Sequence, residues 1–145
     1  MIVKIVNKSK YELPKYETSG SAGFDIRVNT TENVKIPKHG KTELLPTGLF
    51  MEIEPGYEGE IRPRSGLACK HGITLANAPA TIDSDYRGEV KICLVNQFDE
   101  DYILNPGERI CQMLIKPVIQ AELVEVDDLS NTDRGVGGFG STGKV

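Results

Sequence analysis

Residues 81–90 read TIDSDYRGEV and join two runs whose side chains are typical of β-strands. The middle of this stretch is a polar turn that carries an aromatic ring, Tyr86. On charge alone it has the character of an acidic hairpin tip, because aspartate and glycine favour tight turns. The stretch therefore predicts a strand on each side of a short polar turn.

Further strand-like segments recur on both sides of this stretch, separated by turn residues. In one of them Phe24, Ile26 and Val28 alternate with polar residues and are expected to share a buried face. The expected strands cover residues 2–6, 24–28, 34–36, 49–53, 57–62, 73–76, 89–95, 102–104, 110–116 and 122–126. Because no amphipathic helices separate them, the pattern favours an all-β sandwich, jelly roll or barrel.

One segment, residues 65–72 (SGLACKHG), has a helical character instead. Ser65 is a suitable capping residue, good helix formers follow, and Gly72 closes the segment. We predict a helix of about two turns. Since Arg62 and Arg64 precede it, its free backbone N–H groups could bind an anion. The alternative is a surface turn whose arginines are solvated.

The composition fits a single globular domain, with 145 residues of which 39% are hydrophobic and 26% charged. The net charge of −4 argues against a general nucleic-acid or membrane-surface binder, which is usually basic. The N-terminal residues are too charged for a signal peptide, and no apolar run approaches the ~20 residues of a membrane span. We expect a soluble, intracellular, cytoplasmic protein.

The cysteines and histidines show no metal-binding spacing. Cys93 and Cys111 lie in apolar strand-like runs and are expected to be reduced core residues. His39 and His71 stand beside glycines in loop-like sequence, without a constellation of further ligands. The sequence therefore gives no support to a zinc site.

The C-terminal residues 127–145 are polar and rich in glycine, so they are expected to form a flexible arm unless they dock on another surface. The arm contains a G-x-G-x-x-G match at residues 135–140 and a near match to a P-loop at residues 138–145. Both matches lack the strand and helix that such motifs require. Successive glycines could nevertheless bring backbone N–H groups close to phosphate oxygens, and Phe139 could stack on a base.

Five ordered segments resemble the motifs of the trimeric dUTPase family. They are residues 22–26, 62–68, 81–90, 107–113 and 134–143. The resemblance implies a jelly-roll-like β-clip or distorted barrel with one short helix. It also implies a β domain over residues 1–126 and a flexible arm over residues 127–145 that closes the active site.

The same resemblance implies the hydrolysis of dUTP to dUMP and pyrophosphate at the α–β phosphoanhydride. Such a reaction limits uracil incorporation into DNA and supplies dUMP for thymidylate synthesis. The implied assembly is a homotrimer whose active sites are shared between subunits, with no nucleic-acid or membrane partner.

Individual roles follow from the family motifs. Asp83 would activate the attacking water and contact the sugar 3′-hydroxyl, and Tyr86 would pack on the deoxyribose. The implied contacts to the base or the sugar also include Asn77, Thr81, Ile82 and Lys91. Those to the phosphates or the closing arm are Arg64, Ser65, Gly66, Gln112, Arg134, Phe139, Gly140, Ser141 and Thr142. Mg²⁺ would sit on the phosphates, with Asp25 either supporting it through water or acting only as a structural acceptor.

Two departures from the family pattern and two rival functions remain open at this point. Ala80 stands where glycine is expected, and Cys111 stands where alanine is usual. A dCTP deaminase of the same fold is disfavoured because residues 90–95 carry no carboxylate. A regulatory protein that binds nucleotide without turnover is disfavoured because Asp83 and the arm are intact.

Overall fold

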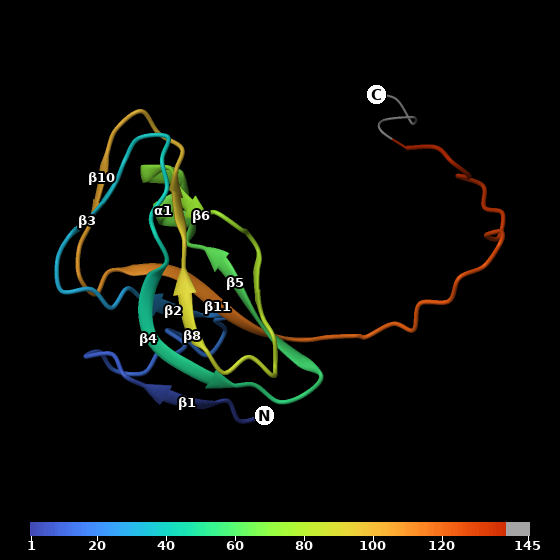
Figure 1. Cartoon of the computed structure of the whole chain (residues 1–145), viewed down its shortest axis with the longest axis horizontal. Coiled ribbons are helices and arrows are strands. Elements are labelled where there is room, and N and C mark those ends of the chain that lie inside the picture. The colour runs from blue at the N-terminus through green and yellow to red at the C-terminus, as the bar shows by residue number, and fades with distance from the viewer. Residues whose placement is uncertain (139–145) are drawn as a thin grey trace.

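The computed structural model describes residues 1–138, which form eleven strands and one helix, α1 (Ser65–His71). A four-stranded antiparallel sheet has the order β2 (Phe24–Arg27), β11 (Arg109–Pro117), β5 (Tyr57–Pro63) and β7 (Ala80–Ile82). A three-stranded sheet has the order β1 (Lys4–Asn7), β4 (Leu45–Glu52) and β8 (Glu89–Ile92). Figure 1 shows β4 and β8 lying across the body from β11 and β5.

Two small sheets complete the body. One pairs β10 (Tyr102–Leu104) with β3 (Val34–Ile36), and the other pairs β6 (Ile73–Leu75) with β9 (Leu94–Asn96). The described strands stay in separate open sheets rather than a closed barrel, which confirms the expected all-β, jelly-roll-like β-clip class. The expected shared face of Phe24, Ile26 and Val28 is also confirmed, since all three side chains are buried in the core.

The helix is confirmed, but its expected cap is wrong. The N-cap residue is Arg64, which has extended backbone and makes no side-chain capping bond, so Ser65 is already the first helical residue. Gly72 ends the helix in the left-handed region at φ 67°, as a closing glycine should. The shift by one residue places the Ser65 side chain on the exposed first turn instead of folding it over the helix end.

Two strand expectations also need correction. Residues 89–95 form β8 and β9 in two different sheets, because the chain leaves β4 after Ile92 and pairs with β6 from Leu94. The strand expected at residues 122–126 is absent from the described structure. After β11 the last backbone hydrogen bond to the body runs from Val118 N–H to Gly56 O at 2.8 Å.

Beyond Val118 the chain runs away from the body (Figure 1). Leu123 and Val124 are 94% and 70% exposed, so the apolar side chains that predicted a strand have no partner strand within the described residues. The extended segment thus begins before the boundary expected between residues 126 and 127. Pairing partners, rather than local propensity, decide whether such a segment becomes a strand.

A buried hydroxyl joins β4 to β8. Thr47 Oγ1 donates to Val90 O at 2.6 Å and accepts from Leu49 N–H at 3.1 Å, with the residue 2% exposed. We expect Thr47→Val to lower the free energy of unfolding by about 1–3 kcal/mol, because both backbone groups lose a partner while buried. Urea unfolding measures the change in the free energy of unfolding. Thr31→Val, at an exposed position, is the control. An equal effect of both substitutions would contradict the prediction.

An ion-pair cluster lies on the polar face of the four-stranded sheet. Glu60 accepts a hydrogen bond from Lys116 Nζ at 2.8 Å and another from Arg62 Nε. These contacts, that with Lys116 first, lower the pKa of the Glu60 carboxyl from its ordinary value of 4.5. A carboxylate with a lowered folded pKa stabilises the fold above its unfolded pKa, and this contribution is lost as the pH falls through the folded pKa.

We therefore expect Glu60→Gln to destabilise the protein most at neutral pH. The difference from wild type should shrink as the pH falls below 4.5, where the carboxyl of the unfolded chain binds a proton, and should vanish once the pH falls through the lower folded pKa. Chemical unfolding over a pH series measures the difference. Glu122→Gln, on the extended segment, should show no such trend, and a Glu60→Gln difference that stays constant below pH 4.5 would contradict the assignment.

Candidate active site

A hollow of about 300 Å³ lies where β7, β8 and the segment between them meet. This volume is at the lower end of the ~300–1,000 Å³ range of small-molecule pockets. Its wall contains all the residues expected to hold the nucleoside. They are Asn77, Thr81, Ile82, Asp83, Tyr86 and Lys91.

The stretch 81–90 that predicted a hairpin is a crossing between two sheets. Ala80–Ile82 pairs with β5 in the four-stranded sheet, whereas Glu89–Ile92 pairs with β4 in the three-stranded sheet. The hairpin expectation is therefore wrong, because each strand finds its partner elsewhere. The crossing opens a gap between the sheets in place of a closed tip, and the pocket occupies this gap.

Asp83 lies at the exposed start of the crossing loop. Its backbone carbonyl accepts a hydrogen bond from Tyr86 N–H at 3.1 Å, which closes a tight turn. Its carboxylate makes no hydrogen bond or ion pair with any residue in 1–138, although it lines the pocket. Such a group is free to accept hydrogen bonds from a ligand hydroxyl and from water.

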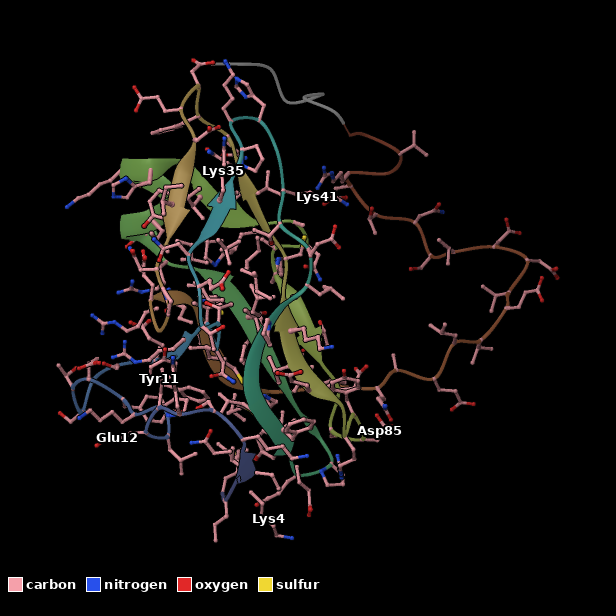
Figure 2. The ribbon with its side chains drawn as sticks, turned by 60° about the vertical axis from the view of Figure 1, so that its left-hand side comes forward. Lys4, Tyr11, Glu12, Lys35, Lys41 and Asp85 are labelled. Carbon is pink, nitrogen blue, oxygen red and sulfur yellow. The ribbon has the colours of Figure 1, made fainter. Side chains whose placement is uncertain are left out.

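The rest of the loop is held by its own polar groups. Arg87 Nη1 donates to Ser84 O at 2.7 Å and to Tyr86 O at 3.1 Å. Asp85 is not part of the pocket wall, and Figure 2 places it at the opposite end of the body from Lys35. The loop therefore presents only one of its two aspartates to the pocket.

Two polar residues of the pocket wall escaped the sequence-based assignment. Glu89 Oε1 accepts a hydrogen bond from Gly48 N–H at 2.8 Å, and its other oxygen lies 3.8 Å from Lys91 Nζ. Cys93 is half-buried in the same wall and donates to Thr42 O at 3.2 Å, so it is not the core residue that was expected. The alternation of residues 89, 91 and 93 could have revealed them, because these positions lie on the same face of the expected strand as the predicted site residue Lys91.

Cys111 is the core thiol that the sequence predicted. It is fully buried, and burial first, with the nearby Asp25 carboxylate second, raises the pKa of its thiol. The third cysteine, Cys69, is exposed on α1, and none of the three is in a disulfide. The replacement at position 111 is thus absorbed by the core and leaves the pocket wall untouched.

The residues expected to bind phosphate form a second, separate group. Asp25 Oδ2 lies 3.1 Å from Arg64 Nε and 3.2 Å from Arg109 Nη1. Gln112, which pairs with Asp25 across β2 and β11, donates to Pro63 O at 3.0 Å. Ser65 and Gly66 are exposed beside this cluster at the start of α1.

None of this second group lines the pocket, so within one chain the structure does not bring the two sets together. Arg64 and Arg109 form ion pairs with Asp25 and Glu17, so the formal charges of these four side chains balance within one chain. One chain therefore presents a nucleoside-sized pocket at one place and the residues expected to bind phosphate at another.

The extended segment contributes a further predicted residue. Arg134 is exposed, and its Nε donates to the carbonyl of Gly137 at 2.8 Å within its own turn. It does not line the pocket of its own chain. The expected contacts at Phe139, Gly140, Ser141 and Thr142 lie outside the described residues.

A protein-held metal centre has no support in residues 1–138, where no three Asp, Glu, His or Cys side chains come together. The carboxylate of Asp25 already faces two guanidinium groups, which fits a structural acceptor better than a metal ligand.

Among the described residues, no helix is long and apolar enough to cross a membrane.

Known proteins resemble this chain over nearly its whole length. The family model for dUTPase matches residues 9–143. The deoxyuridine 5′-triphosphate nucleotidohydrolase of Fusobacterium nucleatum subsp. nucleatum is 52% identical over 142 residues, covering 98% of this chain and 97% of that protein. The enzyme of the same name from Nautilia profundicola is 57% identical over 132 residues, covering 91% of each chain.

The fold agrees with solved structures as well. The dUTPase of Staphylococcus bacteriophage 80alpha with dUPNHPP aligns with a TM-score of 0.85 at 26% identity, covering 98% of each chain. The fold places the chain among the jelly-roll-like β-clip proteins. More particularly, the chain belongs to the dUTPase family.

Proposed function

We propose that the protein hydrolyses dUTP to dUMP and pyrophosphate. The observation that carries this proposal is the unpaired Asp83 carboxylate in the wall of a nucleoside-sized pocket, in a chain of the dUTPase family. Hydrolysis of dUTP keeps uracil out of DNA and provides dUMP for thymidylate synthesis. The chemistry needs one activated water and charge stabilisation on the phosphates.

In the proposed reaction the Asp83 carboxylate takes a proton from a water molecule as its oxygen attacks the α-phosphorus. The bond between the α-phosphorus and the bridging oxygen breaks, and pyrophosphate leaves with the electron pair. A carboxylate suits this base because it also accepts a hydrogen bond from the sugar 3′-hydroxyl. The carboxylate has no competing partner among residues 1–138, which supports this assignment.

The nucleoside would be recognised by the pocket wall. Asn77 and the backbone of Thr81 and Ile82 would hydrogen-bond to the uracil edge, and Tyr86 would pack against the deoxyribose. Lys91, whose side chain is 46% exposed, is available for a contact to the sugar or base. A buried base edge that cannot match fixed backbone groups loses its hydrogen bonds, which disfavours cytosine.

The phosphates would be bound by a second subunit of a homotrimer and by the arm of a third. The separation of the Arg64, Ser65, Gly66 and Gln112 group from the pocket supports this arrangement, because neither half is complete in one chain. The exposed apolar side chains of residues 119–136 support docking of the arm on a neighbouring copy. Arg134, Phe139, Gly140, Ser141 and Thr142 would then cover the bound nucleotide.

Mg²⁺ is proposed to be held by the substrate phosphates. The donor sets of residues 1–138 fit this arrangement, since Asp25 is paired with guanidinium groups and remains within reach only through water. The cation would neutralise charge on the phosphate chain, while Arg64 and the exposed N–H groups of Ser65 and Gly66 orient that chain.

A cytoplasmic location is proposed from the three free thiols.

One assay separates this function from its rivals. The protein is incubated with dUTP or dCTP and Mg²⁺, and both pyrophosphate and the base are followed. Release of pyrophosphate from dUTP with uracil unchanged supports the proposal. Deamination of dCTP would assign the protein to the deaminase branch, and tight dUTP binding without turnover would make it a nucleotide-binding regulator.

A further inference from the structure

Tyr86 is held in the pocket wall by a contact within its own loop. Its ring folds back over Gly88, and its hydroxyl donates to Glu89 O at 3.1 Å. The side chain is 44% exposed, so one side of it remains available to a ligand in the pocket. The position of the ring is thus set by residues 88 and 89 as well as by its own backbone.

The ring leaves no room for a side chain at position 88, because the three atoms nearest to a Cβ there all belong to Tyr86. A Cβ at this position would lie 2.3 Å from Tyr86 Oη and 2.5 Å from its Cζ, far below normal contact. Its φ does not lie in the left-handed region, unlike that of Gly48 at 72°. The backbone of residue 88 therefore accepts an alanine, and the closest clash of that alanine would be with Tyr86.

The carbonyl that accepts the Tyr86 hydroxyl belongs to a hydrogen-bonded strand, β8. Glu89 pairs with Phe50 across β8 and β4, and its carboxylate accepts the Gly48 N–H at 2.8 Å. The following carbonyl, that of Val90, is bound by the buried Thr47 hydroxyl. The hydroxyl of Tyr86 is therefore anchored to strand β8 and not to the loop before it.

We infer that Gly88 and the Glu89 carbonyl are positioning elements for sugar selection, because they fix the Tyr86 ring where a ribose 2′-hydroxyl would have to lie. This inference rests on the proposed function and extends it to two positions that contact no substrate. A ring released from the carbonyl, or pushed off Gly88, leaves room for the additional hydroxyl. Selection of deoxyribose over ribose therefore depends on residue 88 although its only role is steric.

The test compares kcat/KM for dUTP with kcat/KM for UTP. Gly88→Ala should reduce this ratio at least ~10-fold, with much of the change in KM for UTP, which loses its clash. Tyr86→Phe keeps the ring but removes the anchor, and should reduce the ratio ~2–10-fold, the range of a single neutral hydrogen bond. Gly20→Ala is the matched control, because a Cβ there meets nothing within 4 Å.

A double-mutant cycle separates positioning from a general structural effect. In a Tyr86→Ala background, adding Gly88→Ala should change the ratio less than ~2-fold, since the clashing ring is gone. Equal losses in both backgrounds, or an unchanged ratio in Gly88→Ala and Tyr86→Phe, would overturn the inference. If Gly88→Ala does not fold, Tyr86→Phe still decides, because it adds no atom.

Wild-type turnover of dUTP is measured first, so the two proposals fail in different ways. No turnover by the wild-type protein sinks the proposed function itself. Turnover with full selectivity in Gly88→Ala and Tyr86→Phe leaves the function standing and removes only the positioning role.

Discussion

Asp83→Asn should lower kcat for dUTP hydrolysis by ~10³-fold or more, at the upper part of the range for loss of a general base. The amide keeps the size of the carboxylate and can still accept a hydrogen bond, but it cannot take a proton from water. Binding of a non-hydrolysable imido analogue of dUTP should stay within ~3-fold of wild type, because the pocket wall is unchanged. Single-turnover kinetics and calorimetry measure the two quantities.

Asp85→Asn is the matched control for this change. Asp85 lies two positions along the same loop and is likewise exposed, but it does not line the pocket. Its substitution alters the net charge equally and should leave kcat within ~2-fold of wild type, as expected for surface changes away from the site. Comparable losses in both variants would point to the charge of the loop, and normal turnover in Asp83→Asn would remove Asp83 from catalysis.

Removal of residues 134–145 should reduce kcat/KM at least ~10²-fold, because a lid that excludes water and adds phosphate contacts is lost. The melting temperature should not change, since residues 119–138 contribute no strand or helix to the body (Figure 1). Thermal unfolding and gel filtration accompany the kinetics. A lower melting temperature or a changed oligomeric state would show that the arm is structural.

Mixing two inactive variants tests whether the active sites are shared between subunits. Asp83→Asn chains and truncated chains should each be almost inactive alone. Refolded together at equal amounts, they should regain activity in about a quarter of the sites, because one chain can supply Asp83 and another the arm. If each arm closes over its own pocket, every site keeps one defect and the mixture stays inactive.

Much of the strand pattern could be predicted because local alternation records which face of a segment is buried. Residues 24–28, 34–36, 57–62 and 102–104 were placed within a residue or two of β2, β3, β5 and β10. The helix was found from its formers and from Gly72. The segment 122–126 has the same alternation and yet forms no strand, because a strand also needs a hydrogen-bonding partner.

The site was less predictable than the fold. The family resemblance named Asn77, Asp83 and Tyr86 and implied that the site is shared between subunits, but local sequence patterns alone do not show that Arg64 and Gln112 lie outside the same hollow. Cys93 was misjudged because an apolar run does not show which of its members face a cavity. These relations depend on which strands are neighbours in space, which short-range sequence patterns do not encode.

Residues 81–90 show which features the sequence determines and which depend on the tertiary structure. The sequence by itself determined a polar turn with Asp83 and Tyr86 ahead of the strand at residues 89–95, since residue type and alternation are local properties, but it did not predict the short strand Ala80–Ile82. Only the tertiary structure decided that the two strands pair with β5 and β4 in different sheets, which opens a pocket where a hairpin would have closed. It also decided that Gly88 makes room for the Tyr86 ring, because that contact depends on the path of the loop and not on the backbone preference of glycine.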